Sequence, residues 1–301
     1  MSKSPVIKLA SVSKKFGSTK AVDDISLEIE KGEVVGFVGV NGAGKTTTIA
    51  MLLGFIRATN GTVEIFGRTM NVTVAHKFHH DIGYAAGDME MFDKLTGHQY
   101  LEFILRSNGI KNRGRYDELV DQFQPQLDKK IISLSRGNRQ KVALIAAFMT
   151  SPKLVILDEP SSGLDPLMQQ AFLDLVRGEQ AKGTTIFMSS HILSEVADVC
   201  SRVILIARGR IVKDFDTTAL DQISGKRVRV ISAKMLRPPQ KAENITQKKT
   251  KIGYELEFVY RGDLLHLQTW LVRATDLLDL SIIDHDIESM VDELYHKEDE
   301  R

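Results

Sequence analysis

The segment 39–46 constrains the fold of this chain more than any other part of the sequence. It reads Gly-Val-Asn-Gly-Ala-Gly-Lys-Thr and fits the pattern G-x-x-x-x-G-K-[ST], which cradles phosphates where a strand precedes it and a helix follows it. The apolar run Val34–Val38 predicts the strand, and residues 46–53 predict the helix. An α/β fold with a site for a nucleoside triphosphate is therefore expected; a chance glycine-rich turn is the alternative that this context disfavours.

The residue types in this segment suit phosphate binding. Glycines let backbone N–H groups approach phosphate oxygens without a side-chain clash, and the N-terminus of the following helix adds a partial positive charge. Lys45 can reach the outer phosphates, and the Thr46 hydroxyl suits a magnesium ion. The predicted nucleotide contacts in this segment are Gly39, Asn41, Gly42, Ala43, Gly44, Lys45, Thr46 and Thr47.

Length and composition exclude several classes of protein. At 301 residues and 43% hydrophobic, the chain can form one large domain and a smaller one. A net charge of +1 gives no broad attraction to nucleic acid or to an anionic membrane. The single cysteine, Cys200, suits a reducing compartment, and its amphipathic surroundings predict a buried thiol. No apolar signal or membrane-spanning run is present, so we expect a cytoplasmic location and no direct membrane insertion.

A second strand predicts the catalytic groups. The aliphatic run at 154–157 is typical of a central parallel strand, and Asp158, Glu159 and Pro160 follow it. A carboxylate at this position can hold magnesium beside the nucleotide, a role we assign to Asp158. Glu159 is then placed to polarise an attacking water as general base. Two surface acids before a turn are the alternative, which the phosphate-binding segment makes less favourable.

The residues between these two elements carry a family resemblance. Segment 134–141 reads Leu-Ser-Arg-Gly-Asn-Arg-Gln-Lys and resembles the LSGGQ-type motif of ATP-binding cassette (ABC) ATPases, in the variant with a basic third residue. Apolar residues recur at i, i+3, i+4 and i+7 from Val142, so a helix is predicted to begin here. Ser135 and the Gly137 amide would lie at its N-terminus, where the resemblance implies that they hold the nucleotide.

The other motifs of the family follow in order. Asp165 resembles the aspartate of the loop that crosses the dimer interface, and His191 resembles the switch histidine that contacts the γ-phosphate. Phe16 stands where the family has the aromatic residue that stacks on adenine, with a loop-anchoring hydrophobe as the alternative. Val22 is assigned to the same nucleotide contacts. The resemblance extends from about residue 8 to residue 216, and it implies a P-loop cassette with a mixed-sheet core, a helical subdomain, ATP and Mg²⁺.

One position departs from the family. A Gln, or sometimes a Glu, usually follows the Ile-Gly-Tyr-x-x stretch, and here that position is Gly87. Glycine has no side chain to ligate magnesium or orient water, so the role would fall to Asp88, Glu90 or another water molecule. The departure bears on the rate of hydrolysis and on the link to a partner, but not on ATP binding.

The resemblance also implies an assembly. In the family two cassettes face head to tail, and each ATP lies between the phosphate loop of one and the LSGGQ-like motif of the other. We therefore expect a homodimer, with a heterodimer of related cassettes as the alternative. Residues 1–219 are expected to form the cassette, with the helical subdomain at about 84–150 carrying the surface for transmembrane permease subunits.

Residues 220–301 are expected to form a small α+β accessory domain. The sequence predicts strands at 228–231, 254–260 and 278–283, a helix around Leu264 to Leu271, and a closing helix capped by Asp286. Lysines between 241 and 251 are interpreted as a solvated loop. The closing stretch 287–295 resembles the tail of ATPase subunits of ABC-2-type exporters.

The functional expectation is an ATP-hydrolysing subunit of a membrane transporter, with export as the favoured direction. It would lie at the cytoplasmic face of the cell membrane and act through separate permease subunits. Two alternatives stay open. One is an ABC ATPase acting on nucleic acid or ribosomes, which the single cysteine and the single phosphate loop disfavour. The other is an ATP-binding regulator with little turnover, for which Gly87 is the only indication.

Overall fold

A computed structural model describes residues 5–86, 91–219 and 225–284. The chain divides into two compact units, Met1–Phe215 and Asp216–Arg301, which are described separately below. The sequence-based expectation placed the boundary four residues later, at 219/220. The closing helix with Asp286, and Gly87 with its possible substitutes Asp88 and Glu90, lie outside the described residues.

A six-stranded mixed sheet organises the first unit. Its strand order is β10-β9-β3-β8-β7-β6, with β9, β3, β8, β7 and β6 parallel. The strands are β3 (Val34–Val38), β6 (Ile82–Ala86), β7 (Leu154–Asp158), β8 (Thr185–Ser190), β9 (Arg202–Ala207) and β10 (Arg210–Asp216). β3, β7 and β8 are buried along their whole length, which explains their nearly unbroken apolar sequences. The carboxyl ends of the parallel strands therefore meet at one edge, where the predicted site residues follow.

A second sheet and a helix complete the core. The antiparallel sheet has the order β2-β1-β4-β5 and consists of β1 (Ile7–Phe16), β2 (Thr19–Ile29), β4 (Asn60–Ile65) and β5 (Arg68–Thr69). Helix α1 (Lys45–Leu52) contacts β2 and β4 on one side and β7 on the other. One apolar cluster joins all three layers, including Ile7, Leu52 and Phe187, each at most 1% exposed. This packing holds the helix that follows the phosphate loop in place.

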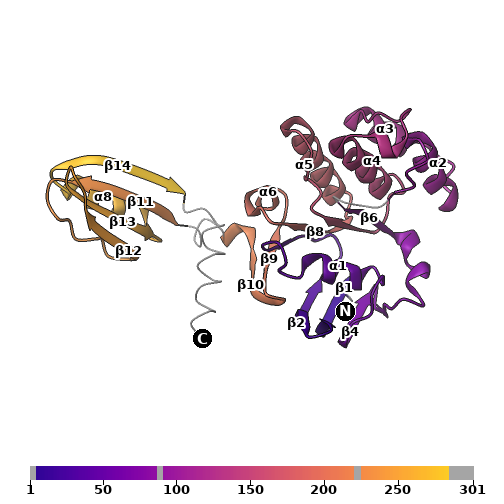
Figure 1. Ribbon diagram of the computed structural model, residues 1–301, viewed down its shortest axis with the longest axis horizontal. Helices are drawn as coiled ribbons and strands as arrows, with labels where there is room; N and C mark the ends of the chain where they lie inside the picture. The colour runs from indigo at the N-terminus through magenta and orange to yellow at the C-terminus, as the bar shows by residue number, and fades with distance from the viewer. Residues whose placement is uncertain (1–4, 87–90, 220–224, 285–301) are drawn as a thin grey trace. The chain divides into compact units, whose positions relative to one another are not determined.

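Helices form a further subdomain of the first unit (Figure 1). They are α2 (Gly97–Ser107), α3 (Gly114–Phe123) and α4 (Arg136–Phe148), and α4 packs on β6. Thr96 caps α2 in a reciprocal capping box with Gln99, which explains why the helix begins there. The mixed-sheet core with a helical subdomain agrees with the fold predicted from the sequence.

Two helices follow the acidic strand end. Helix α5 (Pro166–Ala181) contacts α3 and β8, and the short helix α6 (Leu193–Ala197) contacts β3, β8 and β9. Cys200, just after α6, is 4% exposed, as its amphipathic surroundings predict. Burial raises the pKa of the Cys200 thiol, so this side chain is a core residue and not a reactive thiol.

In the histidine-rich segment before β6, the i and i+4 spacing of His76 and His80 predicts that the two side chains share one face of a helix. Two separate 3-10 turns, Ala75–Lys77 and His79–Asp81, replace one continuous helix. The two histidines therefore do not share a helical face. His79 instead lies 2.9 Å from the Leu53 carbonyl oxygen through Nε2, which fastens this segment to the end of α1.

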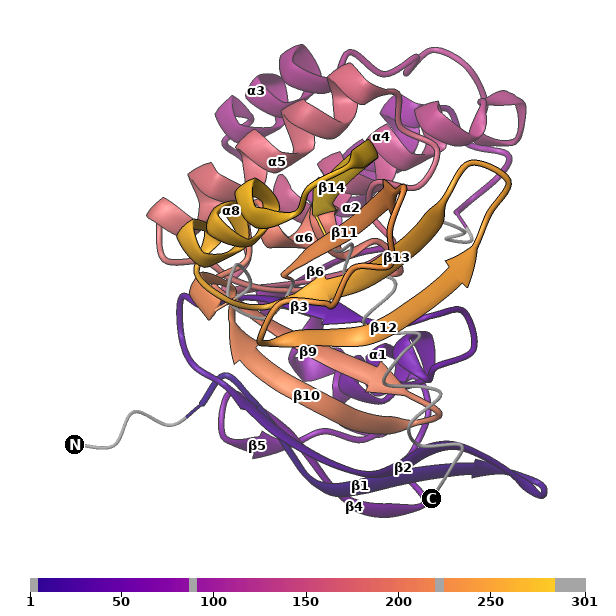
Figure 2. The same cartoon turned by 90° about the vertical axis from the view of Figure 1, so that its left-hand side faces the viewer.

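The second unit is an antiparallel sheet with a helix on one face (Figure 2). Its strand order is β12-β13-β11-β14, from β11 (Lys226–Ser232), β12 (Ala242–Lys249), β13 (Tyr254–Tyr260) and β14 (Leu277–Asp284). Helix α8 (Leu264–Arg273) begins at Asp263, whose carboxylate accepts from the Leu265 N–H, and packs through Leu267 on Val228 and Phe258. The α+β architecture and three of the four strands agree with the sequence pattern.

Strand β12 corrects the expectation of a solvated lysine loop. Lys248 and Lys249 lie on β12 and pair with Glu255 and Tyr254 of β13. The Lys248 ammonium also forms an ion pair with Glu255 at 2.9 Å. The strand is mostly exposed on both faces, so it lacks the apolar alternation by which strands are predicted.

The contact between β6 and α4 generates a stability prediction. A Cβ atom at Gly83 would lie 2.0 Å from the Ala147 carbonyl oxygen, which belongs to helix backbone. Gly83→Ala should therefore lower the free energy of unfolding by about 2 kcal/mol or more. Gly178, in α5, has open space at the same atom, so Gly178→Ala should stabilise by about 1 kcal/mol through helix propensity. Thermal unfolding measures both; equal stability of Gly83→Ala and wild type would contradict the close approach.

Candidate nucleotide site

The phosphate-binding segment forms a tight loop between β3 and α1. A Cβ atom at Gly39 would lie 2.3 Å from the Ile206 carbonyl oxygen, so only glycine fits there. Gly44 has φ 110°, and a Cβ atom there would lie 2.6 Å from the Ala21 carbonyl oxygen. The Gly39 N–H donates to the Ser190 carbonyl oxygen at 3.2 Å, which ties the loop to the end of β8. The loop is thus held by its neighbours in a shape that other residues could not adopt.

Lys45 brings a buried positive charge to the site. Its side chain is 6% exposed, and Nζ donates to the carbonyl oxygens of Gly39 at 2.6 Å and Val40 at 3.3 Å. Nζ also lies 3.2 Å from Glu159 Oε1. A desolvated ammonium group attracts anions strongly, and the adjacent backbone turn presents N–H groups on the same loop. The loop therefore has the donors and the charge that a phosphate group needs.

Asp158 ends β7 beside β8. Its Oδ1 accepts from the Ser189 hydroxyl at 2.5 Å, and its side chain is 6% exposed. Burial, together with the Asp158 charge, raises the pKa of Tyr84 to about 12, so Tyr84 is a neutral neighbour of this carboxylate. A buried carboxylate with one oxygen held by a hydroxyl leaves the other as a ligand for a hard cation.

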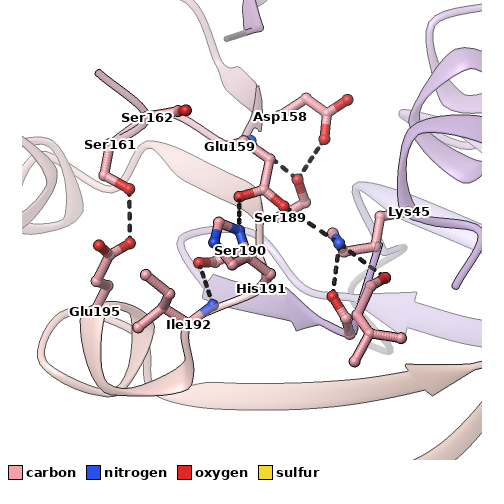
Figure 3. Close-up of polar contacts among 12 residues, drawn as sticks. Lys45, Asp158, Glu159, Ser161, Ser162, Ser189, Ser190, His191, Ile192 and Glu195 are labelled. Atoms are coloured by element: carbon pink, nitrogen blue, oxygen red, sulfur yellow. Dashed lines mark hydrogen bonds and ion pairs between the residues drawn. The ribbon is translucent and has the colours of Figure 1, made fainter. Parts of the chain in front are cut away.

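Glu159 and His191 meet one residue beyond the strand ends (Figure 3). His191 Nδ1 lies 2.6 Å from Glu159 Oε2, while Glu159 Oε1 faces Lys45. Glu159 has φ 51°, a left-handed conformation that is uncommon for a residue with a side chain. This turn directs the carboxylate toward Lys45 and His191. Oε1 is buried and, apart from its ion pair with Lys45, has no hydrogen-bond partner among the described residues.

The site residues fit a nucleotide with a magnesium ion. Gly39 and Gly44 leave no room for a Cβ atom, and the buried Oε1 atom of Glu159 faces the Lys45 ammonium at 3.2 Å without accepting a hydrogen bond from the described residues. Asp158 and the exposed hydroxyl of Thr46 supply the oxygen ligands that Mg²⁺ prefers. When bound, the ion would neutralise phosphate charge. We expect Asp158 and Thr46 to hold it.

Ser135 and Gly137 lie at the start of helix α4. Ser135 is its N-cap, and its hydroxyl accepts from the Asn138 N–H at 3.3 Å. A Cβ atom at Gly137 would lie 2.6 Å from the Gly163 carbonyl oxygen, so the helix start packs against the loop after Glu159. Arg136 donates to the Ser162 hydroxyl at 2.8 Å, which reinforces that contact.

Asp165 caps the next helix. Its Oδ1 accepts from the Met168 N–H at 3.0 Å, and Pro166 follows at the first helical position. The loop that Asp165 ends also carries Ser161, whose hydroxyl donates to Glu195 Oε2 at 2.6 Å. Asp165 thus has a structural role in this chain, in addition to the interface role that the resemblance implies.

Phe16 and Val22, two further predicted nucleotide contacts, differ in their exposure. Phe16 is 51% exposed at the end of β1, which suits a stacking residue, although Lys14 Nζ lies over one face of its ring, 4.9 Å from the centroid. Val22 is fully buried in the core, and its side chain has no exposed surface to offer a ligand. Its neighbour Ala21 instead backs the loop at Gly44, because strand β2 passes directly behind it. We therefore expect Val22 to support the loop from the core.

Direct contacts join one subset of the predicted residues. Lys45, Asp158, Glu159 and His191 are linked through one another and through Ser189, and we call these five residues the strand-end cluster. Ser135, Gly137 and Asp165 lie at the starts of α4 and α5. Ser189 was not among the predicted site residues. Its signal is a polar side chain near the end of a buried strand, two residues before His191.

The fold and the site define a P-loop ATPase of the cassette type. A family model described as "ABC transporter" matches residues 22–162. The uncharacterized ABC transporter ATP-binding protein YhaQ of Bacillus subtilis (strain 168) is 34% identical over 253 residues, which is 82% of this chain and 84% of that protein. The bacitracin transport ATP-binding protein BcrA of Bacillus licheniformis is 34% identical and covers 70% of each chain. The chain belongs to the family of ABC transporter ATP-binding proteins.

Solved structures agree with this assignment. A structure described as the ATP-binding subunit of an ABC transporter has a TM-score of 0.66 at 26% identity, and covers 72% of this chain and 92% of that one. A dimeric post-hydrolysis structure of the ATP-binding cassette MJ0796, bound to ADP and Pi, has a TM-score of 0.65 at 24% identity and covers 70% and 98%. The second likeness shows the fold alone. Family membership supports ATP binding and ATPase activity in general.

The burial of Lys45 predicts its contribution to nucleotide binding. Lys45→Ala removes the only charge of the phosphate loop and should weaken ATP binding by about tenfold or more, measured by isothermal titration calorimetry. Lys153→Ala is the matched control, because Lys153 is 69% exposed in a surface ion pair with Asp81 and should bind ATP as the wild type does. Undiminished affinity in Lys45→Ala would count against the phosphate site.

Proposed function

We propose that this chain is the ATP-hydrolysing subunit of a membrane exporter, which closes and opens as a dimer to move a substrate through separate permease subunits. The observation that carries the proposal is the Glu159 carboxylate, held between Lys45 and His191 directly after the acidic strand end. A chain that only held ATP as a regulator would have no use for a carboxylate fixed in this way.

Hydrolysis follows from the positions of these groups. Glu159 acts as the general base: it accepts a proton from the water that attacks the γ-phosphate. His191 fixes the carboxylate through Nδ1, and Lys45 offsets negative charge on the outer phosphates. A bound magnesium ion supplies further neutralisation of phosphate charge. The loop with Glu159 also packs on the start of α4, so changes at the base reach Ser135 and Gly137 through Arg136 and Ser162.

Dimer closure gives the ATP its mechanical role. Ser135 and the Gly137 N–H at the start of α4 offer a helix N-terminus that favours an anion. In the proposed dimer they meet the γ-phosphate held by the partner's loop, so ATP stabilises the closed pair, and loss of phosphate reopens it. A homodimer is the simplest arrangement, since this chain contains both half-sites.

Replacing the base should separate closure from hydrolysis. Glu159→Gln keeps the shape of the side chain but cannot accept the proton, so ATP turnover should fall by about 100-fold or more. The variant should accumulate as a dimer in ATP, detected by size-exclusion chromatography with light scattering. Unchanged turnover would reject Glu159 as the base.

Two further variants sharpen this experiment. Adding Ser135→Arg to Glu159→Gln should abolish the ATP-dependent dimer, because the bulky side chain blocks the anion-binding helix start. Glu118→Gln, at a carboxylate that is 61% exposed on α3, should behave as the wild type. Persistence of the dimer after Ser135→Arg would argue against closure through the start of α4.

The helical subdomain carries an aromatic cluster that suits a permease. Phe92 is 55% exposed and Phe103 is 49% exposed, and their rings meet edge to face with centroids 5.4 Å apart. Tyr100 supports Phe92 from the buried side at 6.2 Å. Exposed aromatic side chains in contact with one another are typical of protein interfaces. We assign this cluster to the docking of a cytoplasmic permease segment.

The names of relatives favour transport at a membrane. One relative is named for bacitracin transport, and another, YbhF of Escherichia coli (strain K12), is named a probable multidrug ABC transporter ATP-binding protein. Within the described residues, no helix has the length and apolarity to cross a bilayer. We therefore assign the membrane passage to the permease and place this chain at the cytoplasmic face.

A charge introduced into the aromatic cluster should weaken binding to the permease. Phe103→Asp should reduce co-purification with the permease by about tenfold or more, because a desolvated carboxylate would be left unpaired in the interface. ATP binding should be unchanged. Leu265→Asp, at a side chain that is 65% exposed in the second unit, is the control and should keep the permease. Full co-purification of Phe103→Asp from detergent extracts would contradict the assignment.

A further inference from the structure

Ser189 connects the two acidic residues of the site. Its side chain lies at the end of β8 and is fully buried. The hydroxyl donates to Asp158 Oδ1 at 2.5 Å and accepts from the Glu159 backbone N–H at 3.1 Å. One hydroxyl group therefore contacts the side chain of one acidic residue and the backbone of the next, as Figure 3 shows.

We propose that Ser189 is a positioning residue for metal binding and hydrolysis, an inference that rests on the proposed function. By donating to Oδ1 of Asp158, the hydroxyl restrains the carboxylate and leaves Oδ2 as the oxygen that would hold the metal when it is bound. By accepting from the Glu159 N–H, the same hydroxyl holds the backbone turn that aims the base. A single side chain thus sets the position of the metal ligand relative to the base.

Asp158 and Ser189 are both buried, so the hydrogen bond between them is costly to lose. Asp158 is 6% exposed and Ser189 is fully buried, so water cannot replace the hydroxyl without opening the strand ends. Removing the hydroxyl would leave a carboxylate oxygen and a backbone N–H without this partner in a buried region. The Glu159 N–H belongs to a residue at φ 51°, so its hydrogen bond also stabilises an uncommon backbone conformation.

The adjacent serine has a different role. The Ser190 hydroxyl accepts from the Ile192 N–H at 2.9 Å, and its carbonyl oxygen accepts from the Gly39 N–H. Ser190 therefore shapes the turn at His191 and supports the phosphate loop. Among the hydrogen bonds of the described residues, only those of Ser189 reach both acidic residues. Its effect on metal binding can therefore be separated from the role of Ser190 in the phosphate loop.

An isosteric pair of variants tests the hydroxyl alone. Threonine keeps the hydroxyl, whereas valine has nearly the same shape without it. Because both variants carry the extra methyl group, any crowding that it causes in this buried region affects both alike. Ser189→Ala completes the series, and Ser201→Ala, at an exposed serine before β9, is the control.

The measurement is Mn²⁺ affinity in the presence of a non-hydrolysable ATP analogue, by electron paramagnetic resonance, with turnover measured in parallel. Ser189→Val and Ser189→Ala should bind Mn²⁺ about tenfold more weakly and lower kcat by a similar factor, as is usual when a residue that orients a metal ligand is lost. Their affinity for the analogue without metal should not change. Ser189→Thr and Ser201→Ala should match the wild type.

Two results would overturn the inference. Wild-type Mn²⁺ affinity in Ser189→Val would show that the hydroxyl does not position the metal ligand. Equal losses in the threonine and valine variants would assign the effect to packing instead. If the wild-type protein bound no Mn²⁺ with the analogue, the proposed function would fail, and this inference with it; normal wild-type binding separates the two failures.

Discussion

The site depends on one buried positive charge held among backbone carbonyl groups and a carboxylate. Lys45 occupies this place because the loop before α1 closes on it and Glu159 lies opposite. The closure in turn requires that strands β3, β7 and β8 end at the same level. Their register provides this, since Val38 is paired with Ser190 and Asp158 with Ser189. Parallel pairing thus converts three distant segments into one polar edge.

The sequence predicted the parts of this edge that follow from spacing. Fully buried strands have unbroken apolar sequences, and the phosphate loop has its own pattern, so β3, β7, Lys45 and Asp158 were predicted from the sequence. The contacts of Ser189 could not be predicted, because register between parallel strands is a tertiary property. Val22 was also assigned to the nucleotide contacts, but its burial is a property of the folded core that its position in the sequence did not indicate.

The helical subdomain and the catalytic loop form a connected structure. Arg136 contacts Ser162. At the start of α4, Gly137 approaches the Gly163 backbone so closely that only glycine fits at position 137. Gln140, fully within the core, donates to the Pro160 carbonyl oxygen at 2.8 Å. These contacts span the loop that begins with the base and ends with Asp165. A displacement of that loop would therefore be transmitted to α4, which packs against α2, the helix that carries Tyr100 and Phe103.

Strand β12 has a consequence for the behaviour of the protein in a crowded cell. Among the described strands it lies at one border of the second unit's sheet, the position at which a sheet can pair with strands from other chains. Lys248 and Lys249 place ammonium groups on this border, and a foreign strand would have to desolvate them to pair. The lysines that obscured the strand in the sequence are thus of the residue type that disfavours edge-to-edge association of sheets.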